Sequence, residues 1–145
     1  MADFKARGGM KANDDRLRDA AFHEAGHVIV ARELGLPVGE IAIEIDGDEA
    51  KGRSDFGSAH HLPLIDQIAL CVAGVVAQLF FNSAAHNAGA SDYAKVIQLV
   101  EGLADADSLK LSHAADLRAR EILQRRAADV ERLAIRLIKH RRVSM

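Results

Sequence analysis

Residues 22–31, FHEAGHVIVA, combine an apolar pattern with three ionisable side chains. From residue 20 to residue 31 the only polar side chains are those of His23, Glu24 and His27. The apolar residues around them do not alternate as in a half-buried strand, and we expect a mostly buried helix. Ionisable groups on such a helix need partners, because burying an unpaired charge costs on the order of several kcal/mol.

The spacing of the two histidines points to a metal ion. His23 and His27 are four residues apart, so on a helix they project from the same face. Zinc suits such a pair, because it takes imidazole nitrogens and a carboxylate while keeping one position open for water. Glu24 would lie beside the site and could accept a proton from that water. A metal-free core, with hydrogen-bonded imidazoles and a salt-bridged Glu24, is the alternative.

The third metal ligand must come from elsewhere in the chain, and the pattern alone leaves it open. The candidates are His60, His61, His86, His113, Asp66 and Asp92. Asp92 is attractive because it would lie in the first turn of a helix, although the helix dipole favours an acid there without any metal.

Helix signals extend the opening stretch in both directions. Acidic residues predict a helix start near residues 13–15, and Gly35 followed by Pro37 predicts its end. Residues 1–12 are small, polar and Gly-containing, so we expect a flexible N-terminus ahead of a single domain over residues 13–145.

One β segment follows this helix. Ile41, Ile43 and Ile45 alternate with Ala42 and Glu44, which predicts a strand that returns after Asp46-Gly47 as a small hairpin. The strand at residues 40–45 would offer a free edge to an extended peptide unless the rest of the hairpin covers it.

The rest of the chain reads as helices. We predict helices over residues 64–82, over residues 91–103 with Ser91 as N-cap, and over residues 112–142. The last carries an apolar seam that would pack on its own domain or on another protomer; the seam consists of Leu123, Ala127, Val130, Ala134 and Leu137. The expected fold class is mainly α, with about four helices and one small β-hairpin.

Composition and charge argue against a nucleic-acid-binding protein and against a membrane protein. The chain has 145 residues and a net charge of −2, which gives no electrostatic case for nucleic acid or anionic lipid. The longest apolar run, residues 68–81, is too short for a membrane span and contains Gln78. Cys71 is the only cysteine, and no secretion signal opens the sequence, so we expect a reduced thiol and a cytoplasmic protein. The basic residues of 118–142 form either a solvated helix face or a surface for an acidic partner.

Three segments occur in an order typical of one family. They are FHEAGHVIVARELGLPVGEIAI at residues 22–43, ALCVAGVVAQLFF at residues 69–81 and AGASDYAKVIQLVEG at residues 88–102. The chain resembles the peptidase domain of the FtsH-type membrane-anchored AAA zinc metalloproteases over most of residues 19–104. The resemblance implies a mainly helical peptidase domain with a β-hairpin near the active site.

Residue by residue, the resemblance implies that His23 and His27 bind zinc, that Glu24 is the catalytic base and that Asp92 is the distal ligand. The GASD segment is one residue shorter than the family's segment. The family's Gly-Gly-Arg-x-Ala-Glu is here AGVVAQ, with Gln78 in place of the glutamate. A neutral amide binds zinc poorly, so Gln78 is expected beside the metal ligands and not among them.

Together, these features predict a zinc-dependent metallopeptidase-like protein that hydrolyses flexible or unfolded peptides. The sequence contains neither the family's ATPase nor its membrane helices, so ATP-driven degradation of folded substrates is not expected. A homo-oligomer or a partner chain would be compatible with this arrangement. The alternative is a catalytically degenerate relative that serves as an interaction or regulatory module.

Overall fold

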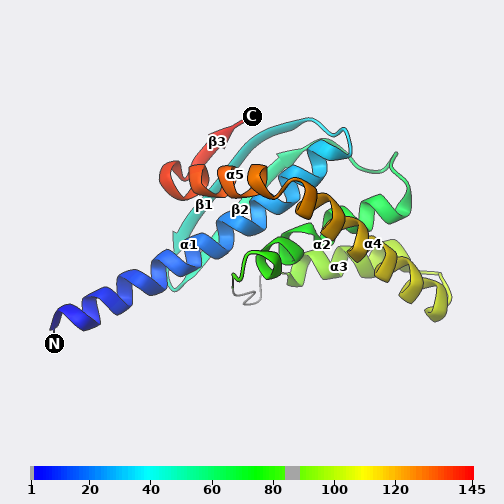
Figure 1. Cartoon of the computed structure of the whole chain (residues 1–145). Helices are drawn as coiled ribbons and strands as arrows, with labels where there is room; N and C mark the ends of the chain where they lie inside the picture. Colours follow the sequence, from blue (N-terminus) through cyan, green and yellow to red (C-terminus); the bar gives the residue numbers. More distant parts are fainter. Residues whose placement is uncertain (1, 84–88) are drawn as a thin grey trace.

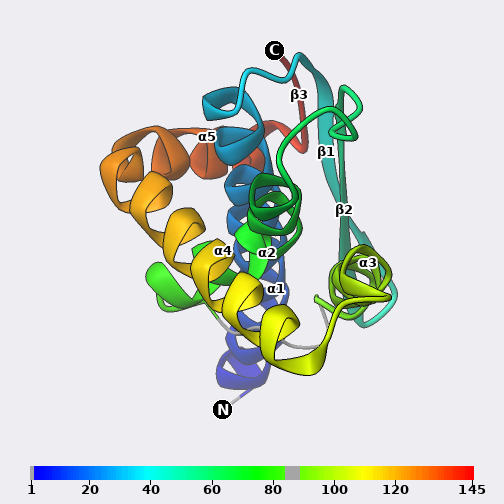
Figure 2. The same ribbon diagram turned by 90° about the vertical axis from the view of Figure 1, so that its right-hand side faces the viewer.

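The structure, a computed structural model, describes residues 2–83 and 89–145, with side chains described from residue 14 onward. The described residues form five helices and three strands. The expected mainly α class with a small β element is therefore confirmed. Figure 1 shows the long first helix crossing the molecule. In Figure 2 the sheet lies on one side of this helix and the last two helices lie on the other.

Helix α1 (Ala2–Glu33) carries the HEAGH residues and begins well before residues 13–15, so the predicted start was wrong. No proline precedes Pro37, and the acids at residues 14 and 15 therefore lie inside the helix instead of starting it. The predicted end is confirmed, because Gly35 follows the helix with a φ of +84°. The flexibility of residues 1–12 and the domain boundary at residue 13 stay predictions.

The β element is a three-stranded antiparallel sheet in the order β2-β1-β3. Strands β1 (Val38–Asp46) and β2 (Glu49–Phe56) form the expected hairpin, and β3 (Arg142–Ser144) pairs with β1 at Glu40, Ile41 and Ala42. The prediction that β1 offers a free edge was wrong, since β1 has a neighbour on each side. Within the described residues, β2 and β3 are the edge strands, and β2 is the one that packs against α1.

Helices α2 (Leu64–Phe80) and α3 (Ala90–Val100) agree closely with two of the predicted helices. The N-cap of α3 was predicted wrongly, because Gly89 occupies that position and no side chain caps the helix. Gly89 packs tightly against α2: a Cβ there would lie only 2.7 Å from Cγ2 of Val75. This close packing fixes the first turn of α3, which contains Asp92.

The predicted helix over residues 112–142 is divided into α4 (Asp105–Arg125) and α5 (Ala127–His140), so that prediction was wrong. The chain turns at Arg126, whose φ of −106° and ψ of 23° interrupt the helix. The reason is packing: α4 lies mainly against α2, whereas α5 lies mainly against α1. Four seam residues are buried in this chain's own core, namely Leu123, Val130, Ala134 and Leu137.

The centre of the core is the contact between α1 and α2. A Cβ on Gly26 would lie 2.5 Å from Cβ of Ala77 and 2.6 Å from the carbonyl oxygen of Ala73. The two helices therefore approach almost backbone to backbone, and the side chains of α1 next to Gly26 lie directly against α2. This approach brings polar groups of α2 within reach of both histidines.

Ion pairs within the chain occupy several cations of the basic C-terminal segment. Arg118 pairs with Asp66, and Arg125 pairs with Glu33 on α1. The choice between a solvated helix face and a surface for an acidic partner stays a prediction. Among the described residues, no helix is both long and apolar enough to cross a membrane.

Candidate metal centre

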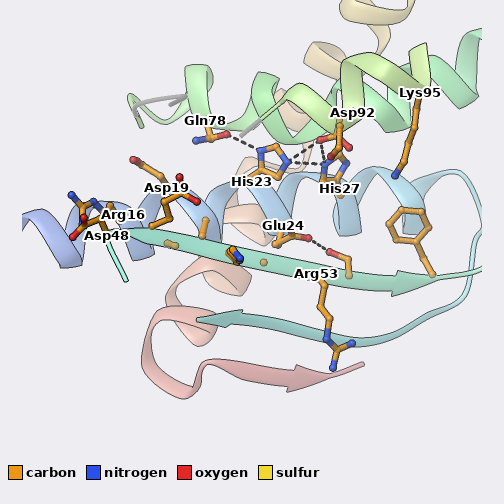
Figure 3. Close-up of a pocket in the computed structure, with 18 residues that line it drawn as sticks. Arg16, Asp19, His23, Glu24, His27, Asp48, Arg53, Gln78, Asp92 and Lys95 are labelled. Atoms are coloured by element: carbon orange, nitrogen blue, oxygen red, sulfur yellow. Dashed lines mark hydrogen bonds and ion pairs between the residues drawn. The ribbon is translucent and has the colours of Figure 1, made fainter. Parts of the chain in front are cut away.

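His23 and His27 lie one turn apart on α1, and Asp92 reaches them from the first turn of α3 (Figure 3). The Nε2 atoms of the two histidines are 3.1 Å apart. Oδ2 of Asp92 lies 3.0 Å from Nε2 of His23 and 3.1 Å from Nε2 of His27. Both histidines are buried and Asp92 is half-buried. The structure therefore brings together the three residues that were predicted as metal ligands.

The outer nitrogens of the imidazoles determine which atoms face the centre. Nδ1 of His27 lies 2.8 Å from the carbonyl oxygen of Leu70, which only accepts hydrogen bonds. His27 must therefore donate from Nδ1, and in the neutral ring its Nε2 carries a lone pair. Nδ1 of His23 likewise donates to Oε1 of Gln78 at 2.7 Å. Two imidazole lone pairs and a carboxylate oxygen consequently converge on one point.

This arrangement fits a small cation in chemistry and in size. Three acceptor atoms at 3.0–3.1 Å repel one another unless a proton or a metal ion lies between them. Tetrahedral zinc with ligands at about 2.0–2.1 Å would hold neighbouring ligand atoms about 3.3 Å apart, close to the observed spacing. Two imidazoles and one carboxylate are the protein ligands of many catalytic zinc sites, which leave the fourth position open.

A glycine on α2 makes room for the two rings. A Cβ on Gly74 would lie 2.6 Å from Nε2 of His23 and 2.6 Å from Nε2 of His27. Any other residue at position 74 would therefore push into the point where the lone pairs converge. Sequence reasoning missed this role, although a glycine inside a strongly apolar helix is itself a sign of close packing.

The local electrostatics couple Asp92 to the imidazoles. Burial acts to raise the pKa of Asp92, but its hydrogen bonds to His23 and His27 and their charges outweigh burial and hold that pKa well below its usual range. For His23, burial acts to lower the pKa. Its contacts with Asp92 and Gln78 and the nearby charge of Glu24 prevail, so the pKa of His23 is raised. Asp92 is therefore an anion at neutral pH and a suitable ligand for a cation.

Glu24 lies on the side of α1 that faces β2 (Figure 3). Its carboxylate is buried, and Oε2 accepts a hydrogen bond from the Ser54 hydroxyl on β2. Gly52 lies directly against the same side chain, since a Cβ there would be 2.6 Å from Cγ of Glu24. Neither Ser54 nor Gly52 was singled out from the sequence, because nothing in the local pattern indicates that β2 covers α1.

A cavity of about 770 Å³ opens beside these groups and is lined by α1, β2 and the start of α3. This volume is in the range of small-molecule binding clefts. His23, Glu24, His27 and Asp92 all line it, so the candidate metal ligands and the second carboxylate share one space. Figure 3 shows Lys95 on α3 extending toward the cavity, whereas Arg53 points away from the histidines.

The other candidate ligands are placed differently. His60, His61 and His113 are exposed, and Asp66 is paired with Arg118. His86 lies outside the described residues. Among the residues that the structure describes, only His23, His27 and Asp92 form a cluster with the spacing that a metal ion requires.

No family model matches the chain, and no curated protein matches it either. The resemblance to FtsH-type peptidase domains therefore stays a prediction.

Proposed function

We propose that this chain is a zinc-dependent metallopeptidase that hydrolyses flexible or unfolded peptides. The observation that carries the proposal is the convergence of two imidazole Nε2 atoms and one carboxylate oxygen of Asp92 at a cavity that the buried Glu24 also lines. His23, His27 and Asp92 would hold the zinc ion, and Glu24 would be the general base. The resemblance to FtsH-type peptidase domains supports the same four roles.

The contacts support a separate role for each group in the proposed reaction. A bound zinc ion supplies Lewis-acid chemistry, in that it lowers the pKa of water toward neutrality and polarises a peptide carbonyl. Glu24 accepts the proton of the attacking water and returns it to the departing amine. Gln78 and the carbonyl of Leu70 hold the imidazoles in the tautomer and orientation that binding requires.

The edge strand β2 supports the proposed class of substrate. Residues of β2, an edge strand of the sheet, line the cavity, and an extended peptide can pair with the main chain of an edge strand. A flexible segment can adopt this extended form directly, whereas a segment held in folded structure must first be released. We therefore propose flexible peptides as substrates, and a cytoplasmic setting in which the partly buried, free Cys71 stays reduced.

The test begins with metal content. Protein purified without chelators should contain close to one equivalent of zinc, and His23→Ala should lose it. Less than about a tenth of an equivalent in the wild-type chain would argue strongly against the site, because zinc sites of this kind bind tightly near neutral pH.

Cleavage of a fluorescently labelled, unfolded protein then tests catalysis. Glu24→Gln keeps the shape of the side chain but cannot take a proton, so it should retain zinc and lose cleavage. Glu131→Gln, at an exposed position on α5, is the matched control and should behave as wild type. Cleavage by Glu24→Gln at the wild-type rate would exclude Glu24 as the base.

A second candidate function is a metal-binding interaction module without catalysis. Gln78 favours it, because the residue that contacts His23 is a neutral amide, at the position where the family that the chain resembles has a glutamate. Stoichiometric zinc with no turnover of any unfolded protein would select this alternative. Turnover that depends on Glu24 would reject it.

A further inference from the structure

Strand β2 holds the side chain of Glu24 from one side. The Ser54 hydroxyl donates to Oε2 of Glu24, and Gly52 lies against Cγ, Cδ and Oε1 of the same residue. Because alternate residues of a strand share a face, Gly52 and Ser54 form one surface against the carboxylate. Glu24 is 7% exposed, so little solvent is available to replace these contacts.

The core fixes the position of this surface. Ser54 is the antiparallel partner of Ile41, and Gly52 is the partner of Ile43. Both isoleucines belong to β1 and are buried in the hydrophobic core, so they anchor β1. Because β2 is paired with β1, it cannot shift along α1 without breaking this pairing or moving the isoleucines. The hydroxyl of Ser54 is therefore presented to Glu24 by a rigid element and not by a loop.

The contact treats the two oxygens of Glu24 differently. Oε2 accepts the hydroxyl proton of Ser54, whereas no hydrogen bond to Oε1 occurs among the described residues. A general base needs one oxygen that can take a proton and a side chain that stays in place while it does so. A hydroxyl that donates to only one oxygen meets both needs.

We propose that Ser54 is a positioning residue for Glu24, holding Oε2 so that Oε1 is the oxygen that receives the proton. This inference rests on the proposed function. It makes Ser54 part of the catalytic machinery although it touches neither the candidate metal ligands nor, in this role, the substrate. Its contribution is to the chemical step and not to the binding of zinc or peptide.

Ser54→Ala should therefore lower kcat by about 10–100-fold, the cost of a misplaced catalytic group, while KM stays within about twofold. Zinc content should remain that of wild type. Ser54→Thr keeps the hydroxyl and suits a strand, so it should recover most of kcat. Ser58→Ala, an exposed serine just beyond β2, is the matched control and should leave kcat unchanged.

A double-mutant comparison separates positioning from a merely structural role. Glu24→Asp shortens the side chain and withdraws the carboxylate from Ser54, and it should leave a measurable residual rate. If Ser54 acts through Glu24, adding Ser54→Ala to Glu24→Asp should cost less than about twofold, because the contact is already lost. A full additional 10–100-fold loss would overturn the proposal, as would wild-type kcat in Ser54→Ala.

Failure of the inference differs from failure of the proposed function. A wild-type chain that cleaves peptides while Ser54→Ala cleaves equally well refutes the positioning role alone. A wild-type chain that binds zinc but cleaves nothing refutes the proposed function. In that case, crystals of the zinc-bound proteins decide the contact: Glu24 should occupy one rotamer in wild type and several in Ser54→Ala, and one rotamer in both would overturn it.

Discussion

Gly74→Ala is the sharpest test of the metal site, because it adds one methyl group at the point where the ligands converge. The new Cβ would lie 2.6 Å from both Nε2 atoms, whereas ordinary van der Waals contact begins near 3.4 Å. Both imidazoles, or the α2 backbone, must therefore shift by about 0.8 Å, whereas a metal site tolerates deviations of only about 0.2 Å. The helix itself gains, since alanine is better than glycine inside a helix by about 1 kcal/mol.

Zinc affinity should consequently fall by at least about 100-fold, which is more than the usual effect of altering a residue behind a ligand. At a zinc concentration 1,000 times the wild-type Kd, bound zinc stabilises the wild-type fold by about 4.1 kcal/mol. A 100-fold weaker site at the same concentration gives about 1.4 kcal/mol. The difference of about 2.7 kcal/mol is well within reach of urea unfolding.

The assay is urea unfolding with zinc and with a chelator, after the wild-type Kd has been measured by competition. Gly39→Ala is the control, because its Cβ would meet Asp55 at an ordinary 3.7 Å and lie away from the histidines. It should keep the full zinc-dependent stabilisation. If Gly74→Ala binds zinc as wild type does, then the two Nε2 atoms do not hold the metal.

Three further outcomes are expected. Gln78→Glu should tighten zinc binding by about tenfold, because an ionised acceptor makes the His23 imidazole a better ligand; unchanged affinity in a chelator competition would contradict this. Without metal, the raised pKa of His23 stabilises the fold fully below the ordinary histidine pKa of 6.5, and this stabilisation is lost as pH rises through the raised pKa. The lowered pKa of Asp92 stabilises the fold above the ordinary aspartate pKa of 3.8, and this stabilisation is lost only as pH falls below that value. The free energy of unfolding in chelator should thus decline from pH 6 to pH 8. The additional stabilisation by zinc should increase over the same interval, because protons compete with zinc for the ligands. The same pH dependence with chelator and with zinc would argue that His23 and Asp92 do not bind the metal. The wild-type chain should prefer peptides with an acidic over a basic residue near the cleaved bond by two- to fivefold, because Lys95 lines the cavity and such a charge contact contributes about 0.5–1 kcal/mol. Lys95→Glu should reverse this preference, whereas Lys110→Glu, at an exposed position on α4, should leave it unchanged.

Local pattern was enough to predict the parts of the site that lie on one element. His23 and His27 share a face because the helical repeat places them there, and Asp92 falls in the first turn of α3 as expected. The resemblance, and not the residue pattern, chose Asp92 among the six candidates for the third ligand. Burial would have favoured the wrong acid, because Asp66 is buried and pairs with Arg118, whereas Asp92 is only half-buried.

The parts that were missed depend on contacts between distant segments. Ser54 meets Glu24 only because β2 folds back over α1, and neither sequence neighbourhood records that contact. Strand β3 has three residues and exists because β1 is there to pair with it. The break at Arg126 was hidden because the apolar spacing continues in phase across it, while the two halves pack on different helices.

The neutral side chain of Gln78 bears on whether the site is catalytic or only structural. With neutral imidazoles, a zinc ion and Asp92 together would carry one positive charge, and Glu24 would balance it. A glutamate at position 78 would add a negative charge behind His23 and make that imidazole a stronger donor to the metal. Stronger donation holds the ion more tightly but weakens it as a Lewis acid, so the amide exchanges some affinity for electrophilicity. Gln78 therefore predicts a site that loses zinc more readily and does not by itself predict an inactive one. The two effects separate in Gln78→Glu: an enzyme should bind zinc more tightly and turn over no faster, whereas a degenerate module should gain affinity and still show no turnover.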